Sequence, residues 1–226
     1  YNAVSGLAAG IHALGLNFDF APVADVSSGK NSVIGDRSFG TDASLCASMV
    51  SVAASALTDT GVVPCLKHFP GYGSASADDH NGPAEVTKTL EELEQCDLVP
   101  FVSGIEKGAP FIMVSHLSVP ALTGGDMPCN LSYEAVTETL RNKMGFTGVI
   151  ITDAQNMASI TSRYDAGEAA VQALKAGVDM ILMPDDLQAA YDAVSSAVGS
   201  GSLSAQRIDE SVLRILQVKA KYGLLP

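Results

Sequence analysis

The stretch Val62–Gly73, VVPCLKHFPGYG, decides the fold that we expect this chain to adopt. It opens with an apolar run, which ends in the pair Lys67–His68, and it continues into a loop that contains Gly71 and Gly73. A continuous apolar run, rather than an alternating one, indicates a strand that is covered on both faces, as in a parallel sheet. The stretch therefore predicts a buried parallel strand with chemically capable side chains at its carboxyl end.

Four other apolar runs resemble this one, and helix-like segments alternate with them. The predicted strands cover residues 16–26, 62–68, 111–116, 148–153 and 180–184. Helical periodicity and capping residues predict helices over residues 43–60, 90–107, 132–143, 167–176, 187–198 and 204–221. Strands that alternate with helices in this way predict one α/β domain over residues 1–226, built on a parallel sheet or barrel.

Polar side chains stand at or just after the end of each predicted strand: Asp25, Lys67 with His68, His116, Asp153 and Asp185. In a TIM barrel the carboxyl ends of the strands converge on one face, which carries the active site. Five predicted strands are too few for a complete eight-stranded barrel. We therefore expect a (β/α)8 TIM-type barrel that lacks its first one or two β/α units in this chain. For Asp185 or Asp186 alone, capping of the next helix is an equally good explanation.

The two ends of the chain leave its cellular location open. The chain begins at Tyr1 without an initiator Met and shows no signal peptide, so we expect a fragment whose amino-terminal part is missing. A cytoplasmic location and a secreted or cell-wall-associated one both fit. A barrel without two strands has open sheet edges, which pairing with a second copy in a dimer would cover.

Composition excludes several classes of partner. The formal net charge is −12 and the sequence has no cluster of Lys and Arg, which argues against a nucleic-acid partner. No apolar run reaches the roughly 18 residues of a membrane span. The four cysteines are scattered without a CxxC pair, and neither a dinucleotide fingerprint nor a Walker A sequence is present, so no metal or cofactor is expected.

The loop after the second predicted strand carries groups suited to proton transfer. Asp78 lies two residues before His80, so the carboxylate can orient the imidazole and favour its protonated form. Asp153, at the end of an apolar strand, can serve as a nucleophile or a general base. The competing interpretation of the adjacent acidic residues is a solvated turn, and Arg37 taken alone would form a surface ion pair with Asp36 or Asp42.

Five motifs together resemble a known family. They are APVADV (21–26), RSFGTD (37–42), KHFPGYGSASADDH (67–80), MVSH (113–116) and GVIITDAQNM (148–157). In this order they resemble the catalytic domain of family 3 glycoside hydrolases, and specifically its β-N-acetylglucosaminidase branch. The resemblance covers nearly the whole chain.

The resemblance implies a retaining glycoside hydrolase that cleaves terminal β-linked N-acetylglucosamine from peptidoglycan- or chitin-derived glycans. Asp153 would be the nucleophile, His80 the general acid and base, and Asp78 the residue that holds His80. The residues that match sugar-binding positions are Lys67, His68, Arg37, His116, Asp25 and Met157. The implied partner is thus a carbohydrate substrate.

The sequence departs from the family pattern at Tyr72, where the branch commonly has His, at Ser74 instead of Asp, and at Gln155 instead of an acidic residue. An acidic sugar-binding loop that precedes these motifs in the family is absent from the chain. Other interpretations stay open: a β-glucosidase-type or phosphorylase member of the family, and a non-catalytic sugar-binding barrel. A metal-dependent barrel hydrolase would use the group Lys67, His68, His116 and Asp153.

Overall fold

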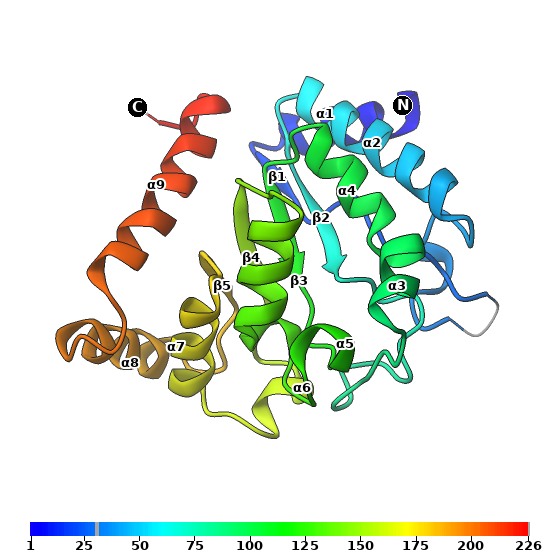
Figure 1. Cartoon of the computed structure of the whole chain (residues 1–226). Helices are drawn as coiled ribbons and strands as arrows, with labels where there is room; N and C mark the ends of the chain where they lie inside the picture. The colour runs from blue at the N-terminus through cyan, green and yellow to red at the C-terminus, as the bar shows by residue number, and fades with distance from the viewer. Residues whose placement is uncertain (30–31, 226) are drawn as a thin grey trace.

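The structure, a computed structural model, describes residues 1–29 and 32–225. Five parallel strands form one sheet whose spatial order, β1-β2-β3-β4-β5, is also their order along the chain. They are β1 (Phe18–Asp19), β2 (Val63–Phe69), β3 (Phe111–Val114), β4 (Val149–Ala154) and β5 (Met180–Leu182). Each new strand is added beside the previous one, as in a barrel, and the curved sheet forms a half-barrel (Figure 1). The parallel α/β fold is thus confirmed, whereas the eight-stranded barrel with its missing units stays a prediction.

The first strand is much shorter than the sequence suggests. Only Phe18 and Asp19 pair with β2, although residues 16–26 read as one strand. Pro22 has no N–H to donate to a ladder, and a single further bridge joins Val23 to Lys67. This bridge still carries the chain alongside β2 as far as Asp25.

The predicted helices are present, and four of the long ones begin at polar side-chain caps: Asp42, Asp165, Asp186 and Ser204. The α-helices are α1 (Asn2–Ala13), α2 (Ala43–Asp59), α3 (Leu90–Glu92), α4 (Val99–Glu106), α5 (Pro120–Thr123), α6 (Ala158–Thr161), α7 (Ala166–Ala176), α8 (Leu187–Gly199) and α9 (Ala205–Lys221). The 3-10 helices are η1 (Gly35–Arg37) and η3 (Cys129–Leu131), and the π-helices are η2 (Leu93–Asp97) and η4 (Glu134–Lys143). The segment predicted as one helix over 90–107 therefore contains a π-turn. Thr89 and Glu92 form a capping box, and Asp186 caps α8, as expected of a strand-end carboxylate in that place.

The two faces of the sheet lie in separate cores. On the outer face, Leu66, Ile112 and Ile150 pack with residues of the surrounding helices, among them Val50 of α2 and Phe101 of α4. On the inner face, the opposite row of side chains forms a second cluster: Val63, Cys65, Phe111, Met113, Val149 and Ile151. Helix α9 packs Ile215, Val218 and Tyr222 against this inner cluster, and Figure 1 shows it on the side of the sheet away from α2 and α4. Burial on both faces explains why the central strands are continuously apolar.

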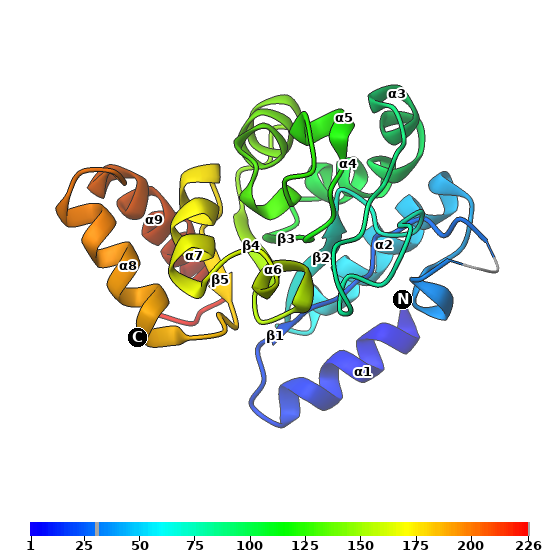
Figure 2. The ribbon, with the colours of Figure 1, turned by 90° about the horizontal axis from the view of Figure 1, so that it is seen from below.

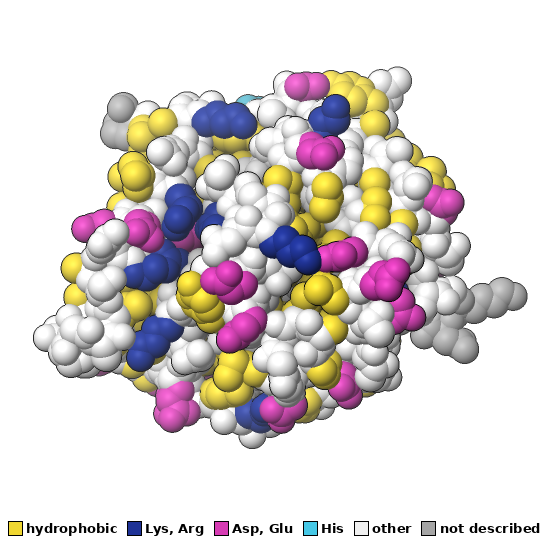
Figure 3. All heavy atoms as spheres, in the orientation of Figure 1, with side chains coloured by type: hydrophobic (Ala, Val, Ile, Leu, Met, Phe, Trp, Pro, Cys, Tyr) yellow, Lys and Arg dark blue, Asp and Glu magenta, His cyan; other side chains and the backbone are white. Residues whose placement is uncertain are grey.

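The loops at the carboxyl ends of the strands gather on one side of the molecule. In Figure 1 the arrowhead of β2 points downward, so Figure 2 looks onto these ends, with α6 and the loop after β2 in front. On the face in Figure 3, the Lys and Arg side chains lie among Asp and Glu side chains. Within the described residues, no helix is both long and apolar enough to cross a membrane.

Candidate active site

Two side chains reach the mouth of the half-barrel by simple strand periodicity. Side chains alternate between the faces of a strand, so Lys67 continues the inward row of Val63 and Cys65. In the same way, Asp153 continues the inward row of Val149 and Ile151. Both charges act on the buried thiol of Cys65: burial raises the pKa of this thiol, Lys67 lowers it, and Asp153 raises it further. The sequence-predicted Lys67 and Asp153 therefore share the inner face at its carboxyl end.

A buried carboxylate fixes the His68 end of β2. Asp25 is fully buried, and one of its oxygens lies 2.8 Å from His68 Nδ1. The same carboxylate accepts the backbone N–H of His68, at 3.1 Å, and that of Tyr72, at 2.7 Å. Because a carboxylate only accepts hydrogen bonds, His68 Nδ1–H is the donor to Asp25, and Nε2 is the ring nitrogen that Asp25 does not occupy. Asp25 thus orients His68 and the turn that follows it.

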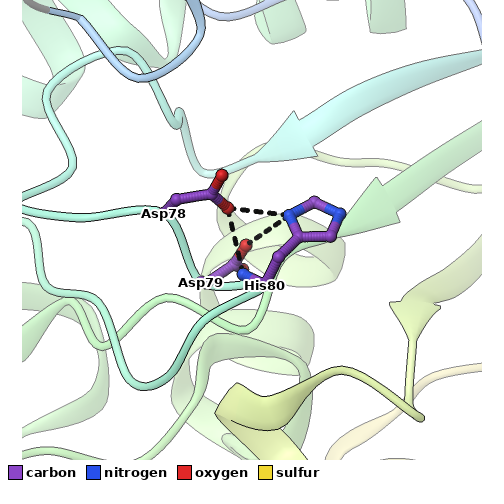
Figure 4. A group of neighbouring side chains, drawn as sticks. All are labelled: Asp78, Asp79 and His80. Atoms are coloured by element: carbon purple, nitrogen blue, oxygen red, sulfur yellow. Dashed lines mark hydrogen bonds and ion pairs between the residues drawn. The ribbon is translucent and has the colours of Figure 1, made fainter.

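A second carboxylate–imidazole pair lies in the glycine-containing loop. His80 Nδ1 is 2.8 Å from Asp78 Oδ1, which also accepts the His80 backbone N–H at 3.0 Å. That backbone bond, with the imidazole beside it, holds the pKa of the Asp78 carboxyl below its ordinary value. Figure 4 shows the other nitrogen of the ring, Nε2, directed away from both carboxylates. The pair is therefore arranged as a proton donor, with Asp78 on one nitrogen and the other left for a ligand.

Asp79 has the opposite environment from its neighbour Asp78. Its side chain is buried, and its Oδ1 accepts a hydrogen bond from the Tyr72 hydroxyl at 2.8 Å. Burial raises the pKa of the Asp79 carboxyl, and the negative charge of Asp153 adds to that effect. The Tyr72 bond, His116 and His80 act in the opposite direction. Asp79 is therefore the loop residue on which the charges of Asp153 and His116 act.

His116 faces the Asp153 strand from β3. Its Nε2 lies 2.9 Å from the carbonyl oxygen of Ala154, so Nε2 carries the proton, and Nδ1 is buried without a partner among the described residues. A buried imidazole nitrogen without a partner is available to hydrogen-bond a polar group of a ligand. His116 is therefore placed as predicted, next to the residue that follows Asp153.

Two of the predicted residues stand less firmly at the site. Arg37 is exposed at the end of η1 and forms no ion pair with Asp36 or Asp42. Ser38, next to it, donates a hydrogen bond to the Asp25 carbonyl, which keeps this segment at the Asp25 strand end. Met157 is buried at the start of α6. Neither Arg37 nor Met157 hydrogen-bonds to His80 or Asp153, so their part in the site stays a prediction.

The structure does not gather the metal-binding set that the sequence left open. Across residues 1–29 and 32–225, the one group whose ligand atoms lie within 4.8 Å of one another is Asp78, Asp79 and His80. His68, His116 and Asp153 are not part of such a group. Asp79 Oδ1 already accepts a hydrogen bond from Tyr72, and Asp78 Oδ1 already pairs with His80 Nδ1, so we assign no ion to this group.

Sequence reasoning missed Tyr72 and Asp79 as parts of the site. Tyr72 stood out only as a departure from a family pattern, and Asp79 only as half of an acidic pair. Their hydrogen bond spans a seven-residue loop, and no periodicity of the sequence indicates which of two adjacent carboxylates is turned inward. A tyrosine between two glycines, followed by adjacent carboxylates, was the only available signal.

Comparison with known proteins places these residues in a family. The family model described as "Glycosyl hydrolase family 3 N terminal domain" matches residues 1–218. The chain is 39% identical over 215 residues to beta-hexosaminidase LpqI of Mycobacterium tuberculosis. This alignment covers 91% of this chain and 55% of that protein. It superposes with a TM-score of 0.94 on a glycoside hydrolase family 3 β-N-acetylglucosaminidase from Paenibacillus, at 37% identity, over 98% of this chain and 43% of the other.

A second similar structure is named for a different activity. Beta-glucoside phosphorylase BglX matches with a TM-score of 0.90 at 28% identity, over 98% of this chain and 41% of that one. The chain spans about half the length of these relatives.

Proposed function

Because the chain belongs to glycosyl hydrolase family 3, we propose that it forms the catalytic barrel of an enzyme that removes terminal β-linked N-acetylglucosamine. The substrates would be glycans derived from peptidoglycan or chitin. The similarity to proteins named beta-hexosaminidase and β-N-acetylglucosaminidase supports the sugar, and the geometry of the loop supports the chemistry. The observation that carries the proposal is the 2.8 Å Asp78–His80 pair, which lies next to Asp79, the carboxyl on which the Asp153 charge acts.

The reaction would proceed in two steps with retention of configuration. The Asp153 carboxylate attacks the anomeric carbon while His80 Nε2 gives its proton to the departing oxygen, which leaves a glycosyl ester on Asp153. Neutral His80 then removes a proton from a water molecule, whose oxygen attacks the anomeric carbon and releases Asp153. Asp78 accepts a hydrogen bond from the Nδ1–H in both steps and stabilises the imidazolium that exists before the first step and is restored by the second.

The remaining residues would hold the sugar. Lys67 supplies a cation at the mouth of the inner face, and its ammonium makes no hydrogen bond within the part of the chain that the structure describes. His68 and His116 are each held through one ring nitrogen, which leaves the other nitrogen for a hydrogen bond to the sugar. We assign Asp25 to the orientation of His68, because it is fully buried. Arg37 and Met157 keep the sugar-binding assignment that the family motifs imply.

A phosphorylase is the second candidate, because a beta-glucoside phosphorylase is among the similar structures. A histidine acid and base does not repel an incoming phosphate as a carboxylic acid would, so phosphate could take the place of water in the second step. Addition of phosphate to the assay separates the two reactions, since only the phosphorylase yields a sugar 1-phosphate.

The test compares p-nitrophenyl β-N-acetylglucosaminide with the corresponding β-glucoside, with and without a chelator. We expect selective cleavage of the acetamido substrate, no effect of the chelator, and loss of activity in Asp153→Ala by roughly four orders of magnitude or more. The exposed helical residue Asp209 provides a matched control, and Asp209→Ala should retain full activity. Equal activity of Asp153→Ala and the wild type would overturn the assignment of the nucleophile, and inhibition by the chelator would favour a metal-dependent hydrolase.

A further inference from the structure

The tip of the His80 loop is attached to the rest of the protein at one point. Two hydrogen bonds between Ser76 and Glu85 close the base of the loop. Beyond them, in residues 77–83, all hydrogen bonds to other parts of the described chain involve the hydroxyl of Tyr72. Asp79 is also the one buried residue of that tip.

The Tyr72 hydroxyl acts as donor and acceptor at the same time. It donates to Asp79 Oδ1 at 2.8 Å and accepts the backbone N–H of Asp79 at 2.7 Å. It also lies 3.5 Å from Asp78 Oδ1, the oxygen that pairs with His80. Burial raises the pKa of the Tyr72 phenol, so the hydroxyl keeps its proton and can donate it at all ordinary pH values. Two bonds to one residue fix both the position and the rotation of the turn.

Tyr72 is itself held by the sugar-binding side of the site. Its backbone N–H donates to Asp25 Oδ1, and its ring lies with a centroid distance of 5.6 Å from the ring of His68. The side chain is 4% exposed and packs in the outer core of the half-barrel. A continuous path of contacts therefore leads from His68 through Asp25 and Tyr72 to Asp79 and the His80 turn.

We propose that Tyr72 and Asp79 form a buried clamp that positions His80 and Asp78 over the strand ends. Both are positioning residues, because they act through His80. The assignment of His80 as the acid and base rests on the proposed function, whereas the mechanical role of the clamp does not. His80 and Asp78 are exposed to 63% and 47%, so their own burial cannot hold them in place. A proton donor displaced by about 1 Å loses much of its effect, which makes this clamp the determinant of acid catalysis.

The test uses Tyr72→Phe, which keeps the packed ring and removes the hydroxyl, with Tyr222→Phe as its matched control. Tyr222 lies on the far side of the inner core and also makes a hydroxyl contact, to Thr58 Oγ1 at 3.1 Å. The first readout is amide hydrogen exchange of residues 76–86, which needs no activity. We expect faster exchange there in Tyr72→Phe and not in Tyr222→Phe, and unchanged exchange would overturn the clamp.

The second readout is the dependence of kcat on the leaving group. For diacetylchitobiose, whose leaving oxygen needs a proton, kcat should fall roughly tenfold or more in Tyr72→Phe, and less for the p-nitrophenyl glycoside. Asp79→Asn keeps both the acceptor oxygen and the backbone N–H, so it should retain nearly wild-type leaving-group dependence. Equal losses on both substrates would overturn the positioning role. An inactive wild type would refute the proposed function alone, and the exchange experiment would still decide on the clamp.

Discussion

The molecule contains the same chemical pair twice, in opposite surroundings. In the Asp25–His68 pair and in the Asp78–His80 pair, a carboxylate oxygen lies 2.8 Å from an imidazole Nδ1. The side chains of the first pair are 0% and 9% exposed, and those of the second are 47% and 63% exposed. The first stands at the end of a strand in the sheet, and the second at the tip of a loop.

In the function that we propose, this difference separates sugar binding from proton transfer. A group that recognises a sugar, here His68, gains from a fixed orientation. Asp25 provides that orientation, because it is completely buried and accepts two backbone N–H groups. A group that must take up and release protons needs access to water and to the leaving oxygen. The loop therefore exposes the reactive pair and buries only its neighbour Asp79. The comparison teaches that the anchor of a catalytic group can be a different residue from the group itself.

The largest expected effect is on the exposed pair. His80→Ala should lower kcat on diacetylchitobiose by roughly 10²–10⁴-fold, since it removes the general acid, and lower it less on the p-nitrophenyl glycoside. Thermal unfolding should be unchanged, because the side chain is exposed. Equal losses on both substrates would count against His80 as the acid.

The next effect concerns the buried pair and should appear as a loss of stability. Asp25→Ala leaves two backbone N–H groups and a ring N–H buried without acceptors, which should cost about 3 kcal/mol or more. For a chain of this size that corresponds to a fall in Tm of roughly 6–12 °C.

Asp78→Ala is the matched control for Asp25→Ala, since exposed pairs contribute little to stability, about 0–1 kcal/mol. Calorimetry of both variants sharpens the comparison between the two pairs. Similar Tm values for the two variants would show that burial does not distinguish them.

The smallest effect is a pH dependence at Asp79. Burial raises the pKa of Asp79 above its ordinary value of 3.8, so the folded protein keeps this proton to higher pH than the unfolded chain. The stabilisation is complete below 3.8 and is lost as the pH rises through the folded pKa. Asparagine does not titrate, so the Tm of Asp79→Asn relative to wild type should increase by a few degrees between about pH 4 and about pH 8. A constant difference in Tm across that range would contradict the raised pKa.

Much of the fold could be predicted, because its strands and helix starts depend on local sequence patterns. The apolar runs gave the five strands, and Thr89 and Asp186 marked helix starts that the structure confirms. Strand-end positions also identified Asp25, Lys67, His68, His116 and Asp153 before any contact was known. The short β1 and the π-turn of η2 were not predictable in this way, because the neighbours in space decide how far a ladder or a regular helix continues.

The sequence by itself determined the alternation of strands and helices, the side of the sheet that carries polar groups, and the family. Each of these depends on burial patterns or on contiguous motifs, which are properties of neighbouring residues. Only the tertiary structure decided that Asp25 holds His68 and Tyr72, which follow it by 43 and 47 residues, and that Asp79 rather than Asp78 is turned inward. Such hydrogen bonds join separate strands and loops, so they depend on how these elements pack together. That packing cannot be predicted from the residue pattern of a single sequence.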